Sequence, residues 1–103
     1  MNESEWRGDI YLQTRLTRDE VSHILQSESA WERVRRYCLS NAVIEADVRR
    51  NPDKRSESPF GVSPLIIEIG KPRSASESAF EIALQDLLNI LRKHSVQYQL
   101  VPK

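Results

Sequence analysis

Cysteine occurs only once in this sequence, at Cys38, so the chain cannot form a disulfide bond within itself. Histidine occurs only twice, at His23 and His94, and neither lies at a spacing from Cys38 that is typical of a metal site. We therefore predict a buried structural thiol and neither a metal nor a cofactor. The opening stretch MNESEWRGD lacks an apolar segment, and no other stretch is apolar enough to cross a membrane. A cytoplasmic location and no membrane partner are expected.

Net charge is also absent, because 15 basic and 15 acidic side chains cancel. The whole molecule therefore exerts no attraction on nucleic acid or anionic lipid, and an electrostatic partner would have to be recognised by a local patch. With 39% hydrophobic residues, the chain is expected to form one domain over residues 1–103 with a core of its own. The polar residues 1–8 are expected to fray.

Sequence motifs of catalysis are missing as well. The chain contains no G-x-x-x-x-G-K-S/T, G-x-S-x-G, H-E-x-x-H or C-x-x-C pattern. Glycine is absent from TRLTRDE (14–20), where a phosphate-binding loop after the first predicted strand would need it. His23 lies beside an apolar stripe and His94 at a predicted helix end, and both positions are typical of structural histidines. The sequence predicts no catalytic residue and no enzyme.

Four segments have the pattern of a β-strand. In IYLQTRL (10–16), AVIEADVR (42–49) and VQYQLV (96–101), apolar and polar side chains alternate. The fourth, PLIIEIG (64–70), is apolar nearly throughout and fits a central strand. The intervening RNPDKRSESPFGVSP (50–64) is rich in turn residues and predicts a long exposed loop.

The segment after the first strand opens with a capping box, in which Thr17 caps a helix and Glu20 closes the box. The apolar stripe that follows falters at QSESA and resumes on a rotated face at Trp31, Val34 and Cys38. Ser29 and Glu32 form a second box of the same type. The pattern predicts one bent helix over residues 18–39 or two shorter helices, and we favour a break near Ser27–Ser29.

The second helix has the clearest pattern in the sequence. Its apolar residues recur at i, i+3, i+4 and i+7 from Phe80 to Leu91, over about five turns. The helix is predicted to begin at Ser74, Ser76 or Ser78 and to include Phe80. SESAWE (27–32) and SESAFE (76–81) are nearly identical, and we interpret both as helix-capping boxes.

The element order β-α-β-β-α-β predicts the α+β class. Two β-α-β halves, whose helices must cover one face of an antiparallel sheet, favour a ferredoxin-like plait. Its four strands would lie in the order 4-1-3-2, with both helical regions on one face and the first broken near Ser27–Ser29. A different α+β sandwich is the alternative.

The open face of this predicted sheet is the first candidate site. It would carry one aromatic side chain, Tyr11, and three acids that repel phosphate, Glu45, Asp47 and Glu68, so RNA binding there is disfavoured. The mixture of apolar and charged residues suits another protein or a second copy of the chain. The residues that we expect to bind a partner are Tyr11, Gln13, Val43, Glu45, Ile66, Glu68 and Val101. An ordinary solvated sheet face is the alternative.

The second candidate is a basic pole, where the first strand ends, the long loop turns and the second helix ends. The residues expected to bind an anion or nucleic acid there are Arg15, Arg18, Arg49, Arg50, Lys54 and Arg55, with Lys93 and His94 nearby. Solubilising charge on a loop is the alternative. The sequence thus favours a small non-catalytic protein-binding or self-associating module, such as a regulator, an inhibitor or an antitoxin-like partner, with nucleic-acid or phosphate binding as the second hypothesis.

Overall fold

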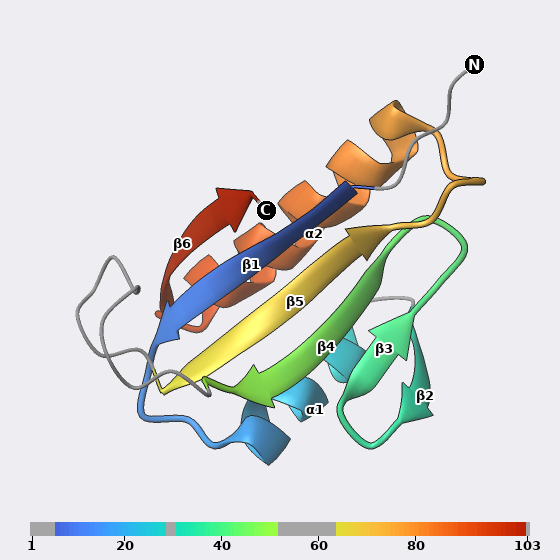
Figure 1. Cartoon of the computed structure of the whole chain (residues 1–103). Helices are drawn as coiled ribbons and strands as arrows, with labels where there is room; N and C mark the ends of the chain where they lie inside the picture. Colours follow the sequence, from blue (N-terminus) through green and yellow to red (C-terminus); the bar gives the residue numbers. More distant parts are fainter. Residues whose placement is uncertain (1–5, 29–30, 52–63, 103) are drawn as a thin grey trace.

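The structure is a computed structural model that describes residues 6–28, 31–51 and 64–102. It is an α+β fold in which two helices cover one face of a six-stranded antiparallel sheet (Figure 1). The strands are β1 (Trp6–Gln13), β2 (Glu32–Arg35), β3 (Cys38–Ser40), β4 (Glu45–Arg50), β5 (Leu65–Lys71) and β6 (Gln97–Pro102), and the helices are α1 (Arg18–Glu28) and α2 (Glu77–Lys93). Neither helix is both long and apolar enough to cross a membrane.

The sheet has the strand order β2-β3-β4-β5-β1-β6. The four predicted strands correspond to β1, β4, β5 and β6, which lie side by side in the predicted order, with apolar β5 between β4 and β1. The predicted strand number is wrong, because β2 and β3 extend the sheet beyond β4. The sheet as a whole is therefore not a four-stranded ferredoxin-like plait.

The predicted helix beyond Glu28 is wrong. Helix α1 ends at Glu28, and the chain returns as the β2–β3 hairpin, which pairs with β4. Ser29 and Ala30 lie outside the described residues, and Glu32 starts a strand, so no second capping box operates there. Strand pairing with β4 overrides the helical spacing of Trp31, Val34 and Cys38, since it buries Leu39 in the core and leaves Val34 62% exposed.

Both helix starts are confirmed. At α1 the Thr17 N–H donates to Glu20 Oε1 over 2.8 Å, and the Glu20 N–H donates to Thr17 Oγ1 over 3.1 Å. These reciprocal bonds satisfy two backbone donors that a helix start leaves without partners. At α2 the cap is Ser76, one of the three predicted serines; its Oγ accepts from the Ala79 N–H over 3.2 Å, and Phe80 already lies in the helix. Because the residue three positions after the cap is Ala79, the interpretation of SESAFE as a capping box is wrong, and only its serine cap is confirmed.

The core lies between the helices and the sheet. Its fully buried side chains come from the inner face of the sheet, from the connection between β3 and β4 and from both helices, and include Ile10, Leu12, Val48, Ile67, Leu25 and Leu87. At the start of β1 the Trp6 ring lies 5.4 Å from that of Phe80 and covers Gly8. A Cβ at Gly8 would stand 2.4 Å from the indole of Trp6, so the close packing of this ring requires glycine.

The predicted frayed start and the predicted long loop lie largely outside the residues that the structure describes. Strand β1 begins at Trp6, so residues 6–8 belong to the sheet rather than to a frayed end, and residues 1–5 are not described. Residues 52–63, most of the predicted exposed loop, also lie outside the described residues.

Candidate functional site

The strand register defines the side chains on the open face of the sheet. Because alternate residues of a strand point to opposite faces, residues paired with one another across strands share a face. One row crosses the sheet through paired residues, in the order Val101, Asp9, Glu68, Asp47 and Cys38. Three adjacent strands therefore each contribute a carboxylate at the same level of the face.

The predicted partner-binding residues lie mainly on this face. Tyr11, Gln13, Glu45, Glu68 and Val101 all occupy open-face positions of their strands. Ile66 also belongs to the face, but it is only 6% exposed, which leaves little of it for a partner to contact. Val43 lies in the connection between β3 and β4 and packs against the core, so it does not belong to the sheet face.

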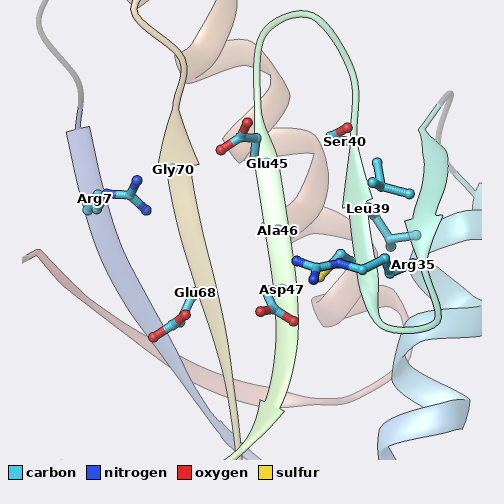
Figure 2. A pocket seen from close by; sticks show the side chains of 11 residues that line it. Arg7, Arg35, Leu39, Ser40, Glu45, Ala46, Asp47, Glu68 and Gly70 are labelled. Atoms are coloured by element: carbon cyan, nitrogen blue, oxygen red, sulfur yellow. The ribbon is translucent and has the colours of Figure 1, made fainter.

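The face is hollowed where β1, β5, β4 and the β2–β3 hairpin meet. This acidic hollow has a volume of about 340 Å³ and is lined by two arginines, Arg7 and Arg35, and by three carboxylates, Glu45, Asp47 and Glu68. Figure 2 shows the guanidinium of Arg35 reaching inward over β4, near Asp47. Ser40 and Leu39 of β3 and Ala46 of β4 complete its wall.

A glycine forms part of the floor of the hollow. Gly70 pairs with Arg7 on one side and Glu45 on the other. Figure 2 shows the side chains of Arg7 and Glu45 reaching toward Gly70 from both sides. Glu45 Oε1 and Arg7 Nη1 lie 3.5 and 3.7 Å from the position that a Cβ of Gly70 would occupy. The missing side chain thus leaves a slot between a carboxylate and a guanidinium.

An irregularity in β2 shapes the opposite wall. The register of β2 with β3 shifts between Arg33 and Arg35, which pair with Leu39 and Cys38 respectively. A bulge of this kind changes the direction of the side chains on the bulged strand. Here it brings both Val34 and Arg35 to the hollow, and Val34 supplies an apolar wall that is largely exposed.

Two of the side chains along the face have a pKa that their surroundings raise. Arg49 Nη1 donates to Glu68 Oε1 over 2.9 Å, and this carboxylate raises the pKa of Arg49. Burial raises the pKa of the Cys38 thiol, and its hydrogen bond with Asp47 raises the pKa further. The thiol is therefore neutral at physiological pH and a weak nucleophile.

The carboxylates of the hollow are hydrogen-bond acceptors for a cationic group. Among residues 6–28, 31–51 and 64–102, no three His, Cys, Asp or Glu side chains are grouped closely enough to hold a metal. Carboxylates that flank a narrow opening form strong charge-assisted hydrogen bonds with an ammonium or guanidinium group.

The predicted basic pole is only partly assembled. Arg15, Arg18 and Arg50 line a second cavity of about 540 Å³ with Tyr37 and Thr17. Arg49 instead lies on the open sheet face beside Glu68, and Lys93 and His94 both bind Glu28 at the end of α1. Lys54 and Arg55 lie outside the described residues.

Several residues that line the hollow were not predicted from the sequence as site residues, among them Arg7, Val34, Arg35 and Gly70. The positions of Val34 and Arg35 in a strand were not predicted, because apolar residues in their segment have a helical spacing. The available signal was the interruption of that spacing at Glu28, where α1 ends. No family model, no curated protein and no solved structure matches this chain.

Proposed function

We propose that this protein is a small non-catalytic module that binds another protein through its open sheet face. The acidic hollow accepts a lysine or arginine side chain of the partner. The observation that carries the proposal is the placement of Glu45, Asp47 and Glu68 around one hollow with a glycine floor.

The charge of the open face supports a basic partner. By register, the described residues of the face include five carboxylates, Asp9, Glu32, Glu45, Asp47 and Glu68, and three arginines, Arg7, Arg35 and Arg49. Nucleic acid is disfavoured on this face because the carboxylates repel phosphate. Among the residues of the face that the structure describes, Tyr11 alone offers an aromatic ring for a base. A basic protein surface meets complementary charge.

The walls of the hollow suit a long cationic side chain. The aliphatic part of a lysine or arginine packs against Val34, while its charged end lies between Glu45 and Asp47. Arg7 and Arg35, which also line the hollow, pair with acidic groups that flank the cation on the partner. Such alternating charges select one register of the partner over others.

We propose no catalytic role for Cys38, for a chemical reason. The one thiol that lines the hollow, Cys38, is kept protonated by burial and by Asp47. A protonated thiol lacks the nucleophilicity that covalent catalysis requires. Regulation or inhibition of a basic protein partner fits a module of this kind.

The test is a titration of the ¹⁵N-labelled protein with a short peptide that contains one Lys-Arg pair, followed by NMR. We expect the amide signals of Ser40, Glu45 and Gly70 to shift. In the double variant Glu45→Gln/Asp47→Asn, the dissociation constant should rise roughly tenfold, because the ligand cation loses two charged acceptors.

Gly70→Ala is a second variant for the same test. The new methyl group would meet Glu45 at an ordinary contact distance, so the fold should persist while the slot is filled. Glu77→Gln, on the exposed first turn of α2, is the matched control. Shifts that are absent, or that survive both hollow variants unchanged, would contradict the proposed site.

A further inference from the structure

The two edge strands of the sheet differ in their protection against pairing with another chain. Edge strand β2 carries Glu32, Arg33 and Arg35 and is interrupted by a bulge, which are the usual means by which proteins block an exposed edge. Edge strand β6, QYQLVP, carries no charged side chain. Its pairing with β1 is regular over six consecutive residue pairs, from Gln97 to Pro102.

The outer edge of β6 is therefore a regular, uncharged strand whose backbone N–H and C=O groups can pair with another strand. Among the described parts of the chain, only β1 pairs with β6. Figure 1 shows β6 at the margin of the sheet, on the side opposite β2. An edge of this kind is a template for another strand.

Helix α2 adds charges along the same side of the molecule. Arg92 lines a hollow with Gln97 and Tyr98 of β6, so its flank of α2 faces this edge. The exposed residues Glu81 and Gln85 precede it at helical spacing and share that flank. The flank is negative toward the helix start and positive toward its end.

We propose that the occupant of this edge is a second copy of the same chain. The two β6 strands pair antiparallel about a twofold axis, with Gln99 of each copy opposite Gln99 of the other. Tyr98 then lies opposite Leu100, on the helix-facing side, where both are only half-buried in the single chain. Pro102, which lacks an N–H group, lies outside the paired residues.

The charges of α2 are complementary under the same symmetry. An antiparallel arrangement places the start of one α2 beside the end of the other. Glu81 of one copy lies opposite Arg92 of the second copy, and each dimer contains this pair twice. The acidic hollow takes no part in this interface, so dimer formation and peptide binding can fail independently.

The test is the mass of the protein in solution, measured by light scattering after size-exclusion chromatography. We expect wild type to have twice the 11.9 kDa mass of the chain. Gln99→Lys and Gln99→Glu, at an exposed position, should each raise the dissociation constant at least tenfold, because like charges meet at the twofold axis. An equal mixture of the two variants should recover the dimer.

Gln13→Lys, also exposed and also on the open face but in β1, is the matched control and should leave the dimer intact. A wild type that stays at the mass of one chain at high concentration would overturn the proposal. A dimer that both Gln99 variants leave unchanged, or that their mixture does not recover, would also overturn it. Circular dichroism of each variant establishes that it is folded.

Discussion

Arg18 donates its Nε–H to the carbonyl oxygen of Val48 over 2.8 Å, and its guanidinium lies 3.8 Å from the centre of the Tyr37 ring. One side chain thereby connects the first turn of α1, the last residues of β4 and the turn of the β2–β3 hairpin. Arg36 lies 5.2 Å from the same ring centre and pairs with Asp19. At the scale of single residues, the arginines of the predicted basic pole thus include one that supports the fold.

Arg18→Lys tests this role. A lysine cannot both donate to Val48 and place a planar cation on the Tyr37 ring, so the free energy of unfolding should fall by about 1–2 kcal/mol. Urea denaturation followed by circular dichroism measures the change. Arg15→Lys, an exposed position that lines the same cavity, should cost almost nothing. Equal losses in the two variants would refute a structural role that is particular to Arg18.

At the scale of elements, the ends of α1 and α2 are joined through Glu28. Lys93 Nζ donates to Glu28 Oε1 over 2.8 Å, and His94 contacts the other carboxylate oxygen. These bonds, that of Lys93 above all, lower the pKa of Glu28 below its ordinary value of 4.5. Because the folded state has the lower pKa, the contribution of Glu28 to stability is present above the unfolded value. It is lost as the pH falls through the folded value.

Glu28→Gln should therefore cause a small decrease in Tm near neutral pH. The difference from wild type should shrink as the pH falls below 4.5 and vanish below the lower pKa of the folded state, because the wild-type carboxyl is then protonated in both states. Thermal unfolding measured at several pH values checks this. A difference in Tm that is the same at every pH would show that the loss does not come from the ionised carboxylate.

The elements that the sequence predicts are those whose local signals agree with their tertiary pairing. The Thr17–Glu20 box and the apolar stripe of α2 are local patterns, and both helices start where these patterns predict. The hairpin of β2 and β3 turns at Arg36 and Tyr37, without the glycine, asparagine or proline that usually marks a turn. Its strand state depends on pairing with β4, which periodicity within the segment cannot reveal.

The same limit applies to the candidate site. Alternation within each strand correctly places Tyr11, Gln13, Glu45, Glu68 and Val101 on the open face. The hollow depends on the register between strands, which sets Arg7, Gly70 and Glu45 side by side, and on the bulge that turns Arg35 inward. Neither feature has a signature in a single strand.

At the scale of the whole molecule, the proposed dimer makes stability depend on concentration. Unfolding of a dimer releases two chains, so dilution favours the unfolded state. The Tm of wild type should rise by about 3 °C for each tenfold increase in protein concentration. Differential scanning calorimetry at three concentrations measures this slope, and Gln99→Lys should reduce it to zero. A flat slope for wild type would contradict a dimer that is coupled to folding.

The uncharged edge of β6 has a consequence for valency. Two copies joined edge to edge form one continuous sheet, and the twofold axis is perpendicular to that sheet. Both acidic hollows therefore open on the same side of the dimer. A partner with two basic segments would engage both, and the second contact would form at a high effective concentration. Weak recognition of a single cation would then become selective recognition of a repeated one.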